Sequence, residues 1–412
     1  MTNINDYNEQ NISQKPAMEV LNNLGYDIIA PQDAEDMRGN LYNVLLTPIL
    51  KKQLEKLNSF EYKSETLKFS NKNIGQAIKD LDESLTNGLV KTNEKIYDTL
   101  MLGRSYQETL SDGRIRSFTI KFIDWENIEN NVFHVVEEFS VERENAKDHA
   151  RPDIVLFVNG IPLGVIECKR ASVSMEQGIS QMIRNQGKDY IPQLFKFAQV
   201  VMATNKNETK YATVSTDAKF WSIWNEQDES WHQNVLSEVV KDRKITVQDE
   251  NIVSLFHPKR LLDMTKYFVV YDIDKKKIAR YQQFFAVREI IKTINTDNEQ
   301  GNRQSGVIWH TQGSGKSITM VMLAKYILSE LDAQRPRVIV VTDRKNLDKQ
   351  IRDTFNHTRL KASRATSGNH LIKLIADNNT DVITTLVHKF DTASKKTKAE
   401  TSRDIFVLVD ES

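Results

Sequence analysis

Residues 310–317, His-Thr-Gln-Gly-Ser-Gly-Lys-Ser, have the types and the order of residues that bind a chain of phosphates. Glycines let the backbone turn its N–H groups toward an anion, and the start of the following helix adds a positive dipole end. Lys316 would reach the β- and γ-phosphates, and the Ser317 hydroxyl would ligate Mg²⁺. We therefore predict that ATP is bound by Thr311, Gly313, Ser314, Gly315, Lys316 and Ser317.

A second group of reactive side chains surrounds a tight turn. Asp153 precedes an apolar run, Asn159-Gly160 is a strong signal for a β-hairpin, and the returning run ends in Glu167-Cys168-Lys169. Side chains alternate across a strand, so Glu167 and Lys169 share a face while Cys168 points into the core. The turn can bring Asp153 close to Glu167. Two carboxylates can hold Mg²⁺, with which a water attacks a phosphodiester, and Lys169 can orient that water.

A third group of candidate residues, which is acidic, follows the apolar run 405–409 at the end of the sequence. Asp410 would hold the Mg²⁺ that accompanies ATP, and Glu411 would polarise the water that attacks the γ-phosphate. The alternative is a strand followed by an acidic turn. The phosphate-binding pattern upstream favours the catalytic interpretation.

The hairpin group resembles the PD-(D/E)xK nuclease family, in which an Asp and a Glu-x-Lys flank a hairpin. The stretch Gln186-Gly-Lys-Asp-Tyr190 is similar to a Q-x-x-x-Y element of some branches, which implies that Gln186 and Tyr190 support the site. At a spacing of four the two side chains would share one helix face. The alternative is an exposed hairpin with a surface Glu–Lys pair. Charges clustered at the end of a strongly apolar strand favour a functional site.

The C-terminal third resembles the superfamily 2 helicases, and His310 in place of the first glycine of the phosphate loop suits that branch. The resemblance implies that Gln282 reads the adenine edge, and that Arg344 and Lys389 contact a DNA backbone. Residues 335–364 carry nine Lys or Arg against three Asp, a local basic patch suited to phosphates.

These groups need elements to hold them, and the sequence predicts an α/β fold. Mainly helical patterns cover 17–100 and strand patterns cover 133–141, 200–202, 211–214 and 220–223. Residues 236–275 differ in composition, with basic and acidic residues mixed among a few apolar ones. After them, predicted strands at 305–310, 337–342, 381–385 and 405–409 alternate with predicted helices at 316–331 and 345–355. Continuous apolar strands of this kind indicate a parallel sheet that is buried on both faces.

We accordingly divide the chain into four parts. Residues 1–15 form a disordered tail, 16–235 a PD-(D/E)xK endonuclease-like domain with N-terminal helices, 236–275 a connector, and 276–412 a first RecA-like P-loop domain, which is incomplete.

Composition limits the class of protein. The formal net charge of 412 residues is zero, so a nucleic-acid surface must be local. The single cysteine excludes an internal disulfide framework and fits the cytoplasm. The polar N-terminus shows no secretory signal, and the sequence has no apolar run of membrane-spanning length.

A nuclease followed by a superfamily 2 motor closely resembles the R (restriction) subunit of type I restriction–modification enzymes, over about residues 16–412. The resemblance implies a type I site-specific deoxyribonuclease that uses ATP and Mg²⁺. It also implies assembly with methylation and specificity subunits, translocation of double-stranded DNA, and cleavage of unmodified DNA at a distance.

One departure from that family is large. Such motors close ATP between two RecA-like lobes, whereas this sequence stops at Ser412, so we expect an N-terminal fragment or a truncated gene product. Two other interpretations stay open: a repair helicase–nuclease that is unrelated to restriction, and an inert truncated protein that docks on partner subunits.

Overall fold

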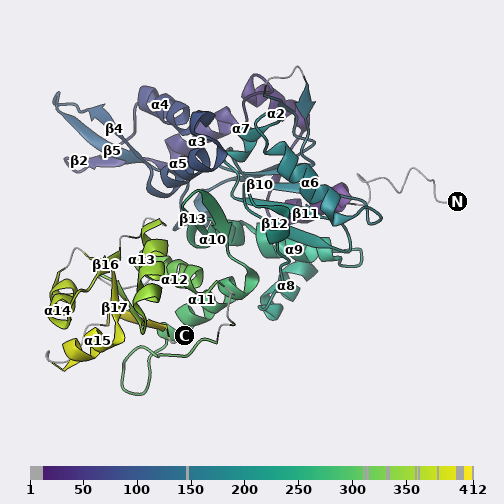
Figure 1. Ribbon diagram of the computed structural model, residues 1–412. Coiled ribbons are helices and arrows are strands. Elements are labelled where there is room, and N and C mark those ends of the chain that lie inside the picture. The colour runs from purple at the N-terminus through teal and green to yellow at the C-terminus, as the bar shows by residue number, and fades with distance from the viewer. Residues whose placement is uncertain are drawn as a thin grey trace. The chain divides into compact units, whose positions relative to one another are not determined.

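The computed structural model describes residues 13–144, 148–309, 311, 315–330, 335–357, 360, 362–377, 380–395 and 403–410. The chain forms two compact units. The first comprises Met1–Lys266 with Asp274–Ile278, and the second comprises Tyr267–Ile273 with Ala279–Ser412. Figure 1 labels their helices and strands.

The first unit is built around a mixed six-stranded sheet whose order is β1-β6-β9-β10-β11-β12. Its strands are β1 (Asp27–Ile29), β6 (Phe133–Glu137), β9 (Ile154–Val158), β10 (Ile161–Cys168), β11 (Val200–Thr204) and β12 (Thr209–Ala212). β9 and β10 are antiparallel, whereas β10 and β11 are parallel, with Glu167 opposite Ala203. Every residue of β9, β10 and β11 is buried, which explains why their sequences are almost continuously apolar.

Ten helices of this unit lie within its described residues. They are α1 (Lys15–Asn23), α2 (Pro31–Arg38), α3 (Thr47–Leu57), α4 (Asn71–Leu81), α5 (Leu89–Leu102), α6 (Met175–Asn185), α7 (Pro192–Phe195), α8 (Glu229–Val239), α9 (Val247–Phe256) and α10 (Pro258–Tyr267), the last of which ends at the unit boundary. Short strands form the hairpins β2 (Phe60–Tyr62) with β3 (Glu65–Leu67), β4 (Arg104–Thr109) with β5 (Ile115–Ile120), and β7 (Val141–Glu142) with β8 (His149–Ala150); β14 covers Lys275–Ile278.

The β9–β10 turn has the predicted geometry. Asn159 and Gly160 both have positive φ, 53° and 83°, as a two-residue hairpin turn requires. A Cβ atom at Gly160 would lie 2.7 Å from the carbonyl oxygen of Leu46, so glycine is also needed for close packing. Thr47-Pro48 begins α3, as its sequence predicts, because proline fits the first turn of a helix.

Three predictions for the first unit are wrong in part. Ser13, Gln14 and Lys15 are not in a disordered tail, since Ser13 and Gln14 are buried and Lys15 begins α1; residues 1–12 lie outside the described range. Residues 236–266 are not a connector: α8, α9 and α10 pack within the unit. The polar Gln248 and Asp249 of α9 are fully buried together with its apolar residues, which obscured the pattern. Residues 220–223 do not form a strand: Phe220 ends a 3₁₀ turn, Ala218–Phe220, and Ser222 forms one isolated bridge with Tyr211.

The second unit contains a parallel four-stranded sheet whose order is β16-β17-β15-β18. Its strands are β15 (Arg337–Thr342), β16 (Ala362–Arg364), β17 (Val382–Leu386) and β18 (Ile405–Asp410), and β13 covers Val269–Asp272. The helices are α11 (Tyr281–Ile294), α12 (Lys316–Glu330), α13 (Lys345–His357), α14 (Gly368–Ala376) and α15 (Val387–Ser394). The predicted parallel strands 337–342, 381–385 and 405–409 are confirmed to within one residue.

The predicted strand at 305–310 is not formed over its described part, 305–309. Val307 and Trp309 are 98% and 91% exposed. The run was predicted from its apolar residues alone, but a strand also requires a neighbour that accepts its ladder hydrogen bonds. The helices α14 and α15 and the short strand β16 were not predicted at all.

Candidate active site

The hairpin brings Asp153 to Glu167-Cys168-Lys169 as predicted. Asp153 immediately precedes β9, where Ile154 pairs with Ile166 of β10. Its Oδ2 atom accepts a hydrogen bond of 2.6 Å from the backbone N–H of Cys168. The carboxylate of Asp153 is therefore fixed at the same end of the sheet as the Glu-x-Lys residues, and it is 6% exposed.

Glu167 and Lys169 form a buried pair. Lys169 Nζ donates to Glu167 Oε1 at 2.6 Å, so the two side chains share a face, while Cys168 is buried on the other face. Burial and then the neighbouring charge of Asp153 raise the pKa of Glu167 to about 8, and the attraction of Lys169 offsets only part of this increase. A carboxyl group this perturbed beside a second carboxylate is typical of a site that does chemistry.

The Glu167 carboxylate has one oxygen left over. Its Oε2 atom is buried and has no hydrogen-bond partner within the described part of the chain. A buried acceptor without a donor is costly unless a cation satisfies it. Asp153 and Glu167 therefore fit Mg²⁺, a hard ion that takes one or two carboxylates and completes its shell with water and phosphate oxygens. No cluster of three or more His, Cys, Asp or Glu side chains suited to a metal occurs in the described ranges.

Helix α6 covers this pair closely because it has a glycine at the crossing point. A Cβ atom at Gly178 would lie 3.3 Å from Lys169 Cγ, 3.3 Å from Ala203 Cβ and 4.0 Å from Glu167 Cγ. These distances leave no spare room for a side chain. Gly178 therefore sets how closely the helix packs on Lys169 and excludes water from one side of it.

The N-terminal segment supplies a residue that the sequence did not indicate. Gln14 Nε2 donates to Asp153 Oδ1 at 2.9 Å and to Glu138 Oε1 at 3.3 Å. Both oxygens of Asp153 consequently have a donor, one from the backbone and one from Gln14. No local signal could reveal this contact, because the partner lies far away in the sequence.

Gln186 and Tyr190 do not share a helix face, because α6 ends at Asn185. The Gln186 amide donates to the Met182 carbonyl at 3.1 Å and accepts from the backbone N–H of Ser215 at 2.7 Å. The Tyr190 ring lies 4.2 Å from the guanidinium carbon of Arg143. The structure gives both side chains packing partners, and their predicted support of the carboxylates stays a prediction.

In the second unit, the predicted phosphate lysine meets the predicted acidic residue. Lys316, the first residue of α12, donates from Nζ to Asp410 Oδ1 at the end of β18, at 3.1 Å. Ser317 follows on the first turn of the same helix, and Thr311 is exposed. Gly313, Ser314 and Glu411 lie outside the described residues.

A glutamine contacts the backbone of Gly315 in the predicted phosphate loop, and it is not the one that the sequence singled out. Gln282 is exposed. Gln283 is buried, and its Nε2 atom donates to the Gly315 carbonyl at 3.3 Å while its Oε1 atom accepts from the Arg280 backbone N–H at 2.9 Å. Gly315 has φ +89°, and a Cβ atom there would lie 2.6 Å from Gln283 Nε2. The signal that was available is the Gln-Gln pair at the start of α11.

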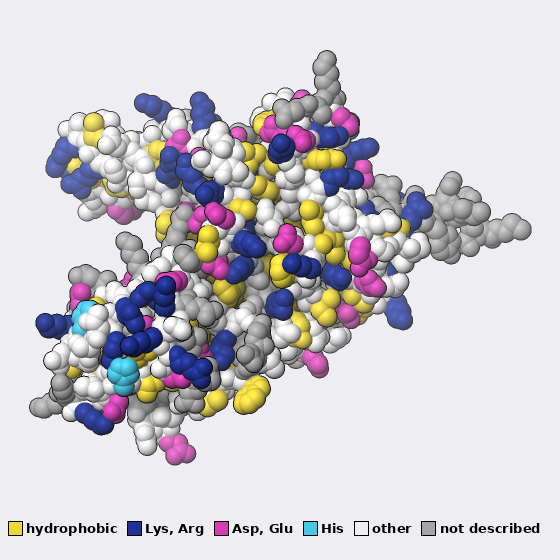
Figure 2. All heavy atoms as spheres, in the orientation of Figure 1, with side chains coloured by type: hydrophobic (Ala, Val, Ile, Leu, Met, Phe, Trp, Pro, Cys, Tyr) yellow, Lys and Arg dark blue, Asp and Glu magenta, His cyan; other side chains and the backbone are white. Residues whose placement is uncertain are grey.

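The two predicted DNA-contacting cations differ in their surroundings. Arg344 is exposed and forms an ion pair with Asp343 at 3.2 Å. Lys389 is half-buried and donates to the Ala365 carbonyl at 3.0 Å. Figure 2 shows Lys and Arg side chains of this unit close together on one face. Exposed Arg344, Lys345 and Lys349 belong to the predicted basic patch.

The chain is an α/β protein that combines a buried carboxylate–lysine edge on a mixed sheet with a second, parallel sheet. The family model for the N terminus of type I restriction enzyme R proteins matches residues 6–220, and the model for SWI2/SNF2 ATPases matches residues 282–412. Since the first match covers more than half of the chain, the chain belongs to the type I restriction enzyme R protein family.

Curated relatives carry the corresponding names. The relative named for the MjaIXP endonuclease subunit of Methanocaldococcus jannaschii is 29% identical over 410 residues, which is 94% of this chain and 38% of the relative. The HindI endonuclease subunit of Haemophilus influenzae is 30% identical over 85% of this chain and 33% of its own length. The SauCOLORF180P endonuclease subunit of Staphylococcus aureus is 30% identical over 66% of this chain and 27% of its own length.

The chain therefore spans about a third of the length of the curated relatives that it matches. Among its described helices, none combines the length and the apolar character that a membrane crossing requires.

Proposed function

We propose that this chain provides the nuclease and part of the ATPase of a type I restriction subunit, which cuts unmodified double-stranded DNA with ATP and Mg²⁺. The observation that carries the proposal is the buried Glu167–Lys169 pair beside Asp153, with one Glu167 oxygen free for a cation. The names of the relatives agree with this activity.

In the nuclease reaction, a water molecule attacks the phosphorus of a DNA phosphodiester and one P–O bond breaks. Asp153 and Glu167 would hold Mg²⁺, which supplies a Lewis acid and a more acidic water. Glu167 holds the Lys169 ammonium at 2.6 Å, so this cation is positioned to orient the attacking water and to offset charge on the phosphorus oxygens. Gln14 and the Cys168 N–H keep Asp153 from rotating.

In the ATPase, Lys316 would exchange its contact with Asp410 for the β- and γ-phosphates. Ser317 and Asp410 would then hold the Mg²⁺ of the nucleotide, and Glu411 would polarise the attacking water. Gln282 is exposed and available for the adenine, whereas Gln283 supports the phosphate loop. Arg344 and Lys389 remain proposed contacts to DNA.

The complete restriction activity extends beyond this chain. Translocation of DNA by the motor and assembly with methylation (M) and specificity (S) subunits are part of the proposal. Net charge zero places DNA contacts on local basic surfaces rather than on the whole molecule.

The test uses the assembled restriction complex with Lys169→Ala, and with Lys52→Ala on α3 as an exposed control. Lys169→Ala is expected to lower the rate of cleavage of unmodified DNA by about 10²-fold or more, while ATP hydrolysis stays near the wild-type rate. Cleavage at the wild-type rate by Lys169→Ala would show that the hairpin is only structural.

A further inference from the structure

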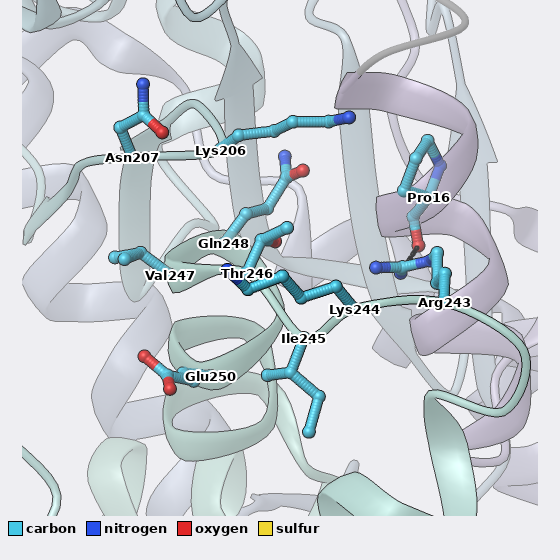
Figure 3. Close-up of a pocket in the computed structure, with 10 residues that line it drawn as sticks. All are labelled: Pro16, Lys206, Asn207, Arg243, Lys244, Ile245, Thr246, Val247, Gln248 and Glu250. Atoms are coloured by element: carbon cyan, nitrogen blue, oxygen red, sulfur yellow. Dashed lines mark hydrogen bonds between the residues drawn. The ribbon is translucent and has the colours of Figure 1, made fainter.

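A cavity of about 630 Å³ lies in the first unit, beside α1 and the start of α9 (Figure 3). Its lining comes from three separate segments: Pro16 of α1, Lys206-Asn207 after β11, and the residues Arg243 to Gln248 with Glu250 around the start of α9. None of these residues was singled out in the sequence, and none belongs to the carboxylate site.

The cavity lies at the same end of the sheet as the carboxylate site. β10 and β11 are parallel, and Cys168 is opposite Thr204 in their register. The backbone N–H of Lys169 donates to the Thr204 carbonyl at 2.8 Å, and Lys206 is only two residues further along. The Lys206 carbonyl in turn accepts from the N–H of Val247, the first residue of α9, at 3.2 Å.

The part of the cavity lining that Gln248 forms is also connected to the carboxylate site. Gln248 is fully buried, and its Nε2 atom donates to Ser13 Oγ at 2.9 Å and to Cys168 Sγ at 3.6 Å. Cys168 lies between Glu167 and Lys169 in β10, with its side chain on the opposite face. The cavity is therefore adjacent to the reacting groups but on the α9 side of the sheet.

Gln248 leaves one amide atom without a partner. Its Oε1 atom is buried and has no hydrogen bond within the described part of the chain, and Figure 3 shows the end of the side chain pointing toward the space below Lys206. The Ser13 hydroxyl, which accepts from Gln248 Nε2 at 2.9 Å, can also donate a hydrogen bond. The amide can therefore be held by its oxygen instead, with its NH₂ group turned into the cavity.

The charges around the cavity favour an anion. Arg243 is neutralised by Asp249, with two hydrogen bonds of 2.6 and 2.8 Å. Lys206 and Lys244, in contrast, have no ion pair or hydrogen bond from their ammonium groups to any residue that the structure describes. Glu250 is the one acidic residue of the lining, and Figure 3 shows it on the side away from Lys206.

We propose that this cavity binds a backbone phosphate of the DNA, one that neighbours the phosphodiester that is cut. Lys206 and Lys244 would be its cations and Gln248 its hydrogen-bond donor. This inference rests on the proposed nuclease function, since it assigns the cavity to the same substrate. The site positions DNA and does not read its sequence, because phosphates are identical along the strand.

The experiment measures duplex affinity of the assembled complex by fluorescence anisotropy at several salt concentrations, without ATP. Lys206→Ala with Lys244→Ala should weaken binding about tenfold and reduce the magnitude of the slope of log K against log salt by about 0.9, the release from one phosphate. Lys52→Ala with Lys72→Ala, exposed lysines of α3 and α4, is the matched control. Gln248→Leu should weaken binding severalfold at an unchanged salt slope, and a thermal unfolding curve shows whether that variant is folded.

Wild-type affinity and slope in the Lys206/Lys244 variant would overturn the cavity proposal, and so would equal losses in both lysine pairs. If Lys169→Ala abolishes cleavage in either case, the nuclease proposal stands by itself. Titration with inorganic phosphate separates the other source of this anion: phosphate-induced thermal stabilisation that needs Lys206 and Lys244, combined with unchanged duplex affinity, would identify a free-phosphate site and overturn the DNA assignment.

Discussion

Gln14 and Asp153 are 139 residues apart in the sequence, and Gln14 Nε2 donates a hydrogen bond of 2.9 Å to Asp153 Oδ1. The other oxygen of Asp153 accepts from the Cys168 backbone. The segment before α1 thus completes the polar surroundings of a carboxylate that we propose to hold a metal ion. Groups that orient metal ligands in this way contribute to affinity and activity without touching the metal.

Gln14→Leu should therefore impair the nuclease. The variant removes the Gln14 donor from Asp153 Oδ1 and holds the carboxylate less firmly, so we expect about a tenfold loss of cleavage together with weaker Mg²⁺ affinity. DNA cleavage is measured across a Mg²⁺ titration. Gln76→Leu, on the exposed face of α4, is the control, and equal cleavage by both variants would show that Gln14 serves only to anchor α1.

The contrast between predicted and unpredicted parts of this site has a physical cause. The hairpin was predictable because Asn159-Gly160 and the alternation of β10 are local signals, and they place Glu167 and Lys169 on one face. Gln14 was not predictable, because a polar residue near a terminus resembles a disordered tail until its distant partner is known.

The same reasoning explains the remaining errors. Gln186 and Tyr190 have helical spacing, but the helix ends before them, and spacing alone does not show where a helix ends. The buried polar residues of α9 made a helix of the core look like a connector. In the second unit the parallel strands were predicted from continuous apolar runs. Val307 to Trp309 is also a continuous apolar run, but it pairs with no neighbouring strand of the described residues and therefore forms no strand.

The pKa of Glu167 predicts a pH dependence of metal binding. At a pKa of about 8, roughly a tenth of this carboxyl group is ionised at pH 7 and most of it at pH 9. Mg²⁺ affinity should rise about tenfold over that interval, with release of about one proton per ion at pH 7 and little at pH 9. Calorimetry in buffers of different ionisation enthalpy measures both quantities, and a flat affinity would contradict the proposed ligand.

The same shift predicts how stability depends on pH without metal. The pKa of Glu167 is raised in the folded state above its ordinary value of 4.5. Its contribution to stability is therefore fully present below about pH 4.5 and is lost as the pH rises through about 8. Urea unfolding between pH 6 and pH 9 should show less of this decline in Glu167→Gln, which cannot ionise.

Gly178 provides a steric test of the site. Valine at this position needs space that Lys169 Cγ and Ala203 Cβ occupy at 3.3 Å from the first added carbon. We expect Gly178→Val to displace Lys169 and lower cleavage by about 10²-fold, because small misplacements of a catalytic group are costly. Gly75 of α4 is a helical glycine with nothing within 4 Å of an added Cβ atom, so Gly75→Val carries the same loss of helix preference without the clash. Equal cleavage by the two variants would argue against close packing at Lys169.

The two glutamines of α11 should have separable effects on nucleotide binding. Gln283 contacts the Gly315 carbonyl, so Gln283→Leu should weaken ATP and GTP about equally and severalfold, through the phosphate loop. Gln282 is exposed and proposed to read the base, so Gln282→Ala should mainly lower the preference for ATP over GTP. Competition binding with a fluorescent nucleotide measures both, and the opposite pattern would reverse the two assignments.

The last prediction concerns the coupling of the two sites. Lys316 donates to Asp410 at 3.1 Å and would reach the β- and γ-phosphates when ATP binds. In the assembled complex, Lys316→Ala should abolish ATP hydrolysis and translocation, since the variant removes the cation at the phosphates. Cleavage of circular unmodified DNA should also fail, although no nuclease residue is changed, because we propose that cutting follows translocation. Lys325→Ala, on the same helix α12, is the control for stability. Cleavage by Lys316→Ala at the wild-type rate would separate the nuclease from the motor and favour a nuclease that acts without ATP.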